Sequence, residues 1–487
     1  MSDRGWRPDK ASIAPSQKSI YNFVSMLRRL LYLFILSSLL SGCGTSIPTP
    51  LDAFKPLTEE DEIKISRQFR RDAKRMFKLV TQPEVQQYVN QVGRNILSVM
   101  GPQPFEYKFY VVEDPQLNAF AVPGGSIYIN TGIIENAKST DELASVISHE
   151  IIHVKGRHIA RMSGPDLASM IGMLGMLLGA AGGNAGAAGM VGQAIATQSR
   201  ISFTRRIEQE ADTLGVKYMA EAGYDPRGAL GFFKTIAMER VLNPVNAPPY
   251  LLTHPLTDER IASVNIVIRA LDLRGISPRR PDPLKRVQAI LRLEKQKANP
   301  GNDWVRKLFV PHFQERGEVA HLRGLEYFYQ GAWAQALESY EQARAISPDS
   351  PGLDRDLGRL YTQIGEYGLA HQAFERALSR EPKMPVTYLY LAELFERESQ
   401  FREAAFAYRK ALQLSPLWPE PARRLGEVYN KMDRLGDAYY YLGRSHQLAD
   451  EDEKAIDDLE RAVKIFGPYS PRGQVIYDEL EAIKARI

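Results

Sequence analysis

The sequence predicts a mostly helical α+β domain with a small sheet, followed by an all-α solenoid of short repeats. Two observations support this prediction. An apolar helical stretch near residue 150 follows strand-like segments that contain a glycine turn. From about residue 317 onward, small and aromatic residues recur with a period of 34 residues. A chain of 487 residues is long enough for two or three domains, and a formal net charge of +4 gives no reason to expect a nucleic-acid partner.

The N-terminal stretch predicts an export signal and a tether. Two arginines precede an apolar run, residues 30–40, which is shorter than the roughly 20 apolar residues that span a membrane. The run ends in Leu-Ser-Gly-Cys at Cys43, which resembles the bacterial lipobox. We therefore expect a signal peptide with its extension in 1–42 and a lipidated tether in 43–57. The alternative is a buried cysteine behind an uncleaved anchor.

The lipobox also predicts a location. A lipidated Cys43 would anchor the mature protein to the cell envelope, on the periplasmic side. Gly44 follows where an aspartate usually favours the inner membrane, so the outer membrane is favoured. Met26 begins a more usual signal than Met1 does, and we expect translation to start there. With the one cysteine lipidated, the mature chain has no disulfide and depends on packing for its stability.

Residues 58–275 predict one domain of helices around a small sheet. Apolar residues recur at helical spacing in five segments: 58–80, 83–99, 204–222, 226–237 and 258–271. Residues 105–112 are rich in β-forming side chains and predict a strand. Residues 118–132 predict two more strands joined by a Pro-Gly-Gly turn. A small sheet therefore precedes the helix that carries the main motif.

That helix, Asp141–His158, contains His149-Glu150-Ile151-Ile152-His153, an H-E-x-x-H motif. Positions four apart lie on one helical face, so the two imidazoles can share a zinc ion. Glu150, beside the first histidine, can take a proton from a water held there. The alternative is a chance match on a buried helix. Two histidines leave the site incomplete, and a third ligand is needed. We expect His158 to be only a cation at the helix end.

The helix after the next apolar stretch supplies candidate acids. Glu208 and Asp212 lie four residues apart on one face. With Glu208 as third ligand, the fourth position stays open for water, as catalytic zinc sites require. Asp212 could then accept the other N–H of His149 or His153. Glu210 is the rival ligand, although no acid follows it at the same spacing.

Three motifs together resemble those of one family: His149-Glu150-x-x-His153, Glu208-x-x-Ala211-Asp212, and Asn118-Ala-Phe-Ala with Pro123-Gly124-Gly125. The family is that of the membrane-associated zinc endopeptidases that include the CaaX-prenyl protease and HtpX, and the resemblance covers roughly 57–270. It implies a gluzincin-type metallopeptidase fold with one Zn²⁺ per chain. His149, His153 and Glu208 would bind the metal, and Glu150 would act as the general base.

The resemblance extends to a possible switch. Thr253-His254-Pro255 with Arg260 after it is similar to a family segment whose histidine reaches the zinc from a loop. His254 would then fill the open fourth position and hold the enzyme inactive. From the residues alone, a lone histidine before a proline is more often on a surface loop. We also expect an extended peptide to pair with an edge strand at Ser126, Ile127 and Tyr128.

Residues 164–198 are rich in Gly, Ala and Met and are too interrupted for a spanning helix. Two interpretations stay open: a surface loop without a function, or a hydrophobic lid over the site. Residues 276–316 predict a helical linker.

Residues 317–487 carry the period. Gly324, Tyr327, Ala336, Tyr340, Ala343 and Pro348 recur as Gly358, Tyr361, Ala370, Phe374, Ala377 and Pro382, and again from Ala392 to Pro416. This is the tetratricopeptide signature, in which small residues lie where paired helices touch. Such arrays bind proteins or peptides. Four arginines on first helices of repeats either face a ligand or form a solvated face: Arg355, Arg359, Arg423 and Arg424.

Two functions follow from the whole sequence. The first is a zinc endopeptidase that degrades misfolded or misassembled outer-membrane proteins, takes them up through its repeats and aids their assembly. The second is a chaperone-like adaptor that binds an outer-membrane assembly machine and whose zinc site is silenced. Expected partners are unfolded envelope proteins, this machinery and the membrane through the lipid anchor.

Overall fold

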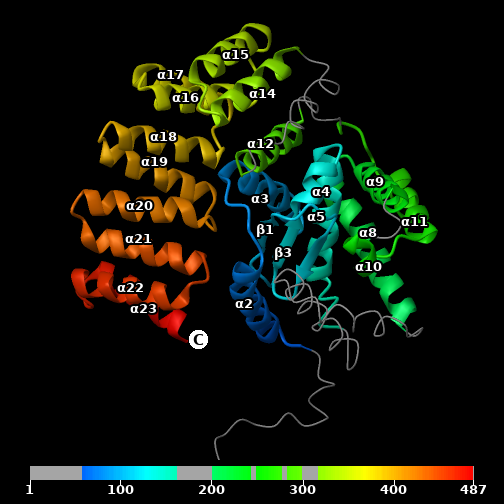
Figure 1. The fold of residues 1–487 in the computed structure, drawn as a ribbon. Helices are drawn as coiled ribbons and strands as arrows, with labels where there is room; N and C mark the ends of the chain where they lie inside the picture. The colour runs from blue at the N-terminus through cyan, green and yellow to red at the C-terminus, as the bar shows by residue number, and fades with distance from the viewer. Residues whose placement is uncertain (1–56, 162–199, 243–247, 277–281, 299–315, 486–487) are drawn as a thin grey trace, which may run out of the picture. The chain divides into compact units, whose positions relative to one another are not determined.

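The computed structural model describes residues 57–161, 200–242, 248–276, 282–298 and 316–485 (Figure 1). Cys43, the predicted signal and the 164–198 stretch lie outside the described residues, so the predictions made for them stay predictions. Within the described ranges, every helix is too short or too polar to cross a lipid bilayer.

A three-stranded sheet lies in the N-terminal domain. Its strands are β1 (Lys108–Val112), β2 (Ala119–Val122) and β3 (Ser126–Asn130), in the order β1-β3-β2. β1 pairs in parallel with β3, and β2 pairs antiparallel with it. Gly124 and Gly125 make the turn between β2 and β3 at φ values of 85° and 102°, which glycine adopts without a steric penalty.

The strand order corrects one prediction. We expected an edge strand at Ser126, Ile127 and Tyr128, but β3 is the middle strand and all five of its residues are buried. The glycine turn predicts only the β2–β3 pair, and the pairing with β1 on the other side is a long-range contact. The open edge that lies along the motif helix belongs to β2.

Eight helices surround this sheet in the described ranges: α2 (Glu59–Met76), α3 (Pro83–Ser98), α4 (Thr131–Asn136), α5 (Thr140–Lys155), α8 (Arg200–Glu221), α9 (Gly228–Leu242), α10 (Pro249–Thr253) and α11 (Asp258–Ala270). The motif helix α5 begins where the Ser139 side chain accepts the Glu142 N–H. It packs against α3, α8, α9 and β2, and nearly all of its residues are buried. The motif therefore lies at the centre of the domain.

The repeats follow as paired helices (Figure 1). They are α14 (Arg316–Tyr329), α15 (Trp333–Ile346), α16 (Leu353–Ile364), α17 (Tyr367–Arg380), α18 (Pro385–Arg397), α19 (Phe401–Leu414), α20 (Pro419–Lys431), α21 (Leu435–Leu448), α22 (Asp452–Phe466) and α23 (Pro471–Lys484). The periodic aromatic residues Tyr340, Phe374 and Tyr408 are completely buried. The helix pairing continues through α22 and α23, which are separated at Gly467, a residue with a φ of 82°.

The expected linker contains α12 (Pro283–Ala298), which is part of the core. Leu284, Val287 and Ile290 are buried in one apolar cluster that includes residues of α3 and α5 as well as of the first repeats. α12 therefore packs both against the N-terminal domain, through α3 and α4, and against α14 of the first repeat.

A buried ionic cluster fastens the repeats to the N-terminal domain. Glu84 of α3 accepts hydrogen bonds from Arg286 at 2.7 Å, Arg355 at 3.0 Å and Arg359 at 3.2 Å. Asp356 also binds Arg286, at 2.8 Å. Arg355 is therefore buried in an ion-pair network rather than on a solvated face, and Arg359 bonds to the same Glu84 while it lines a cleft beside the first repeats.

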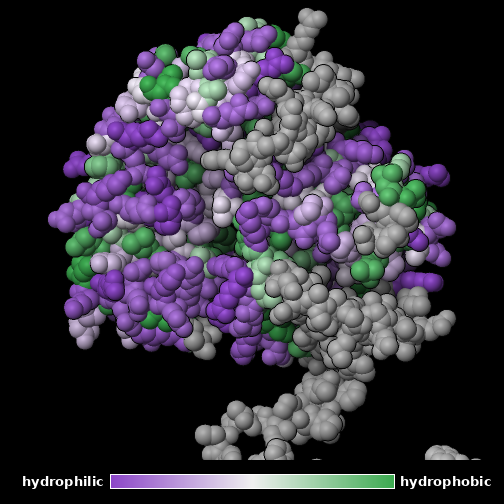
Figure 2. All heavy atoms as spheres, in the orientation of Figure 1, coloured by the Kyte–Doolittle hydropathy of each residue, from purple (hydrophilic) through white to green (hydrophobic). Residues whose placement is uncertain are grey.

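The other two arginines behave as surface residues. Arg423 bonds to Glu420 and Glu427 on its own helix, and Arg424 bonds to Glu396 at 2.9 Å. The repeat helices are mostly hydrophilic on the face drawn in Figure 2, as expected for solvated helix faces.

Candidate metal centre

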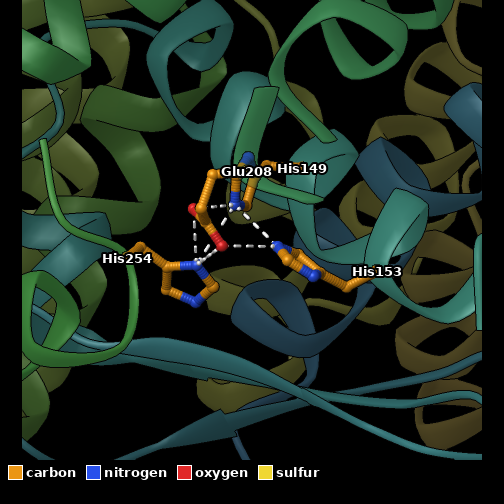
Figure 3. Close-up of side chains that lie close together, drawn as sticks. All are labelled: His149, His153, Glu208 and His254. Carbon is orange, nitrogen blue, oxygen red and sulfur yellow. Dashed lines mark hydrogen bonds and ion pairs between the residues drawn. The ribbon is translucent and has the colours of Figure 1, made fainter. Parts of the chain in front are cut away.

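Four side chains meet in the core of the N-terminal domain (Figure 3). His149 and His153 come from α5, Glu208 comes from α8, and His254 follows α10. One ligand atom of each residue lies within 4.8 Å of the ligand atoms of the others. His149, Glu208 and His254 are buried, and His153 is nearly so. The i,i+4 spacing on α5 and the packing of α8 along it bring the set together.

The distances between these atoms fit a zinc ion. His149 Nε2 lies 3.0 Å from His153 Nε2 and 3.3 Å from His254 Nδ1. Glu208 lies 3.4 Å from each of His149 and His153, and 3.0 Å from His254. Ligands bonded tetrahedrally to zinc at 2.0–2.2 Å lie roughly 3.4 Å apart. Three imidazole nitrogens and a carboxylate are also ligands that zinc prefers.

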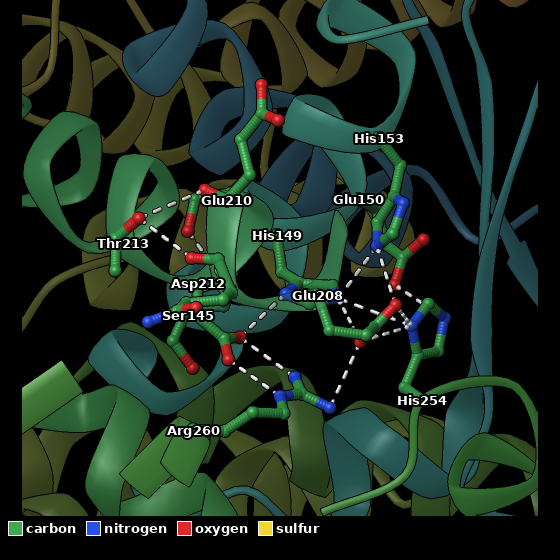
Figure 4. A network of polar contacts seen from close by, with 12 residues as sticks. Ser145, His149, Glu150, His153, Glu208, Glu210, Asp212, Thr213, His254 and Arg260 are labelled. Atoms are coloured by element: carbon green, nitrogen blue, oxygen red, sulfur yellow. Dashed lines mark hydrogen bonds and ion pairs between the residues drawn. The ribbon is translucent and has the colours of Figure 1, made fainter. Parts of the chain in front are cut away.

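Around this set, Asp212 and Arg260 hold the ligands in place (Figure 4). Asp212 Oδ1 lies 2.9 Å from His149 Nδ1, so the His149 N–H can donate to it and leave Nε2 facing the cluster. Arg260 donates to both oxygens of Asp212, at 2.7 and 2.8 Å, and lies 3.0 Å from Glu208. One arginine thereby orients two of the acids.

The second motif histidine has a different partner. His153 Nδ1 lies 3.0 Å from His158 Nδ1, and His158 is completely buried. The expected role of His158 as a cation at the helix end is therefore wrong. Arg157 adopts a φ of 49°, which turns the chain back after the helix. Gly156 makes room for the ring, since a Cβ there would lie 2.3 Å from His158 Nε2.

The protonation states follow from burial and neighbouring acids. Burial alone would lower the pKa of His149, but the hydrogen bonds of Asp212 and Glu208 raise it to about 10. Burial lowers the pKa of His153 to about 4. Burial, reinforced by the nearby His153, lowers the pKa of His158 to about 3. A neutral His158 can accept the N–H of His153, which leaves His153 Nε2 free to bind a cation.

Glu150 stands beside the cluster without belonging to it. Its Oε1 lies 3.6 Å from His254 Nε2 and has no hydrogen-bond partner among the described residues. Burial raises the pKa of this carboxyl group. A buried carboxylate with a free oxygen next to a metal site suits a general base. Glu210, the rival ligand, points away from the cluster, 3.4 Å from Arg161.

Sequence reasoning missed one contributor to the site and misjudged another. The ring of Tyr250 lies 4.6 Å from that of His254 and fixes the loop beneath the cluster. His158 was found but misjudged. The Gly156 that precedes it was the available signal, because a glycine so close to a metal-binding helix indicates a tight contact.

Comparison with protein families matches residues 81–267 to peptidase family M48. Tetratricopeptide-repeat models match residues 321–385, 355–419 and 437–467. The candidate metal ligands and α5 lie inside the first match. The helices α15 to α19 and α22 lie inside the repeat matches, whereas α23 lies beyond them.

Three curated relatives are similar in sequence. The putative beta-barrel assembly-enhancing protease of Vibrio cholerae is 29% identical over 292 residues, which cover 57% of this chain and 59% of the relative. The beta-barrel assembly-enhancing protease of Yersinia pestis is 35% identical over 46% of each chain. The mitochondrial metalloendopeptidase OMA1 of Arabidopsis thaliana is 33% identical over 34% of this chain and 33% of the relative.

The matches thus span less than two thirds of the length of these relatives. Two of the relatives are named as proteases and one as a metalloendopeptidase, and the family match covers the whole candidate metal centre. Residues 81–267 of the chain therefore match peptidase family M48, and tetratricopeptide repeats follow them.

Proposed function

We propose that this chain is a zinc-dependent endopeptidase of the bacterial cell envelope. It degrades misfolded or misassembled outer-membrane proteins and aids their assembly. The observation that carries the proposal is the buried set of His149, His153, Glu208 and His254, with the free oxygen of Glu150 beside it. The match to peptidase family M48 supports the same chemistry.

The roles of the residues follow from their positions. Zinc, once bound, supplies the positive charge that polarises a peptide carbonyl and a water molecule. Glu150 takes the proton from the attacking water and passes it to the leaving amine. Asp212 and Arg260 hold His149 and Glu208 in position throughout, because both are bonded to their partners before substrate arrives.

The substrate strand is β2 rather than β3. β2 pairs with β3 on one side only, and its other edge lies along α5. The main chain of Ala121 lies next to the Glu150 carboxyl group. An extended peptide added to this edge would run past the general base, which suits cleavage within a chain.

His254 would block the open coordination position of the zinc site and so keep the enzyme inactive until it moves. A catalytic zinc site keeps one position open, and His254 Nδ1 stands within 3.0–3.3 Å of Glu208 and His149, where that position would be. Displacement of His254 would open the site. The same observation favours the second candidate, a chaperone-like adaptor in which the silenced site has only a structural role.

The names of the relatives support the substrate class and the partners. Two are beta-barrel assembly-enhancing proteases, which fits a role beside an outer-membrane assembly machine. The repeats are the part that would bind proteins. The lipobox at Cys43 supports a lipid anchor, with the outer membrane as the location.

Digestion of casein separates the two candidates. We expect wild type to cut slowly, His254→Ala to cut faster and Glu150→Gln to be inactive while it still binds zinc. If all three proteins are equally inert and still bind an envelope partner, the adaptor is the correct function.

A further inference from the structure

A cleft of about 980 Å³ contains none of the candidate metal ligands in its lining. Its walls are the segment 78–83 before α3 and the first repeats, and α12 contributes Leu291, Glu294 and Lys295. The segment 78–83 lies beside β1, whereas the motif helix lies along β2. The cleft and the metal centre therefore border opposite edges of the same sheet.

One wall of the cleft is an open strand edge. Val80 N–H donates to Val111 O at 2.9 Å, and Glu113 N–H donates to Lys78 O at 2.8 Å, so Leu79 forms an isolated antiparallel bridge with Val112 at the end of β1. In this pattern the N–H and C=O of Leu79 point away from β1. Neither group has a hydrogen-bond partner within the described ranges, and the same holds for the Thr81 N–H. Groups spaced in this way pair with an extended peptide.

The facing wall is aromatic. Phe328, Tyr329, Trp333 and Tyr390 line it. The guanidinium of Arg359 already lies 4.7 Å from the ring centre of Phe328 and 4.3 Å from that of Tyr390. The wall therefore accepts stacked cations. Trp333 remains 38% exposed and offers a further ring of this kind.

The charges of the lining favour a basic ligand. Two of its cations are paired, Lys78 with Glu113 and Lys295 with Glu135, and Arg359 shares Glu84 with two other arginines. Arg397 bonds to the neutral Gln363.

Two carboxylates, Glu294 and Glu393, have neither an ion pair nor a hydrogen bond to any residue that the structure describes. Burial raises the pKa of Glu393, and the nearby Arg424 and Arg359 offset this only in part.

We propose that this cleft binds an extended polypeptide segment with basic side chains. The segment adds to the Leu79 edge as an outer strand, and its lysine or arginine side chains lie against Trp333 and the two free carboxylates. The site is separate from the metal centre and binds without cleavage. It gives the protein a second hold on a non-native chain.

The test uses two fluorescein-labelled octapeptides, one of alternating valine and lysine and one of alternating valine and glutamate. Fluorescence anisotropy measures their binding to the full-length Glu150→Gln protein, which leaves the peptides intact. We expect the lysine peptide to bind more tightly than the glutamate peptide. Binding should persist when a chelator removes metal, so a failure of the metal centre leaves this test unaffected.

Two further substitutions locate the peptide. Leu79→Pro removes the outward N–H while the bonds of Lys78 and Val80 to β1 remain, and Trp333→Ala removes the exposed ring. Each should weaken binding of the lysine peptide about fivefold or more. Phe406→Ala is the matched control, since this exposed aromatic side chain of α19 lies outside the cleft lining.

Circular dichroism checks that each variant is folded. If Leu79→Pro does not fold, the binding result for Trp333→Ala alone tests the proposal. The proposal is overturned if the folded variants bind the lysine peptide as Phe406→Ala does, or if both peptides bind equally.

Discussion

The two motif histidines, His149 and His153, have hydrogen-bond partners of different kinds at their Nδ1 atoms. His149 is backed by the carboxylate of Asp212, whereas His153 is backed by the neutral imidazole of His158. A carboxylate that accepts the N–H of a histidine makes the other ring nitrogen a stronger metal ligand, and a neutral imidazole has a weaker effect of the same kind. The position of His158 is maintained by the unusual backbone of Arg157 and by Gly156.

We predict that His158→Phe lowers zinc affinity by about 10- to 100-fold, the usual cost of losing such a partner. Competition with a chelator of known affinity measures the change. His158→Asn should lose less, because the amide oxygen can still accept the N–H of His153. His371→Phe, on the repeats, serves as the control. Equal zinc affinity in all four proteins would contradict a positioning role for His158.

At the scale of elements, buried ion pairs hold α3 and α2 against the repeats. Glu84 is surrounded by three arginines, and Asp450 binds Arg70 of α2 at 2.7 Å and Lys108 of β1 at 3.5 Å. Removal of one partner from a buried pair leaves an uncompensated charge, which costs more than the pair itself contributes.

We predict that Glu84→Gln lowers the free energy of unfolding by about 3–5 kcal/mol. Urea denaturation measures it. Glu60→Gln is the control, since Glu60 pairs with Lys64 on the surface and should cost less than about 1 kcal/mol. If the two variants are equally stable, the cluster around Glu84 does not fasten the repeats.

The Asp450 pair also predicts a pH dependence. Although burial opposes it, Arg70 and Lys108 hold the pKa of Asp450 below its ordinary value of 3.8. A carboxyl group whose pKa is lower in the folded state stabilises the fold above pH 3.8, and that contribution is lost as the pH falls below it. Asp450→Asn should therefore be less stable than wild type near neutral pH. The difference should shrink in acid-induced unfolding measurements below pH 3.8, and a constant difference would contradict the assignment.

At the scale of the whole molecule, local patterns predicted more than long-range contacts. The i,i+4 spacing of His149 and His153 and the 34-residue period depend on neighbours in sequence, and the helices appear where these patterns place them. Glu208 and His254 lie 55 and 101 residues beyond His153, and only the family resemblance selected them from other acids and histidines.

Other features depend on tertiary contacts that no local pattern encodes. The middle position of β3 requires knowledge of the β1 pairing. The pairing of Arg355 and Arg359 with Glu84 requires knowledge that α3 brings Glu84 against α16. A helical arginine has the same sequence signature whether it faces water or a buried acid, so the sequence could not distinguish these cases.

The central claim is that one zinc ion is held by three histidines and one glutamate. His254 takes the fourth coordination position, which water must occupy for peptide hydrolysis. Zinc K-edge X-ray absorption on the purified full-length protein tests it most directly. We predict one zinc per chain with three imidazole ligands in wild type, and two imidazoles with an added oxygen ligand in His254→Ala. Absence of zinc, or the same two-imidazole spectrum in both proteins, would contradict the claim.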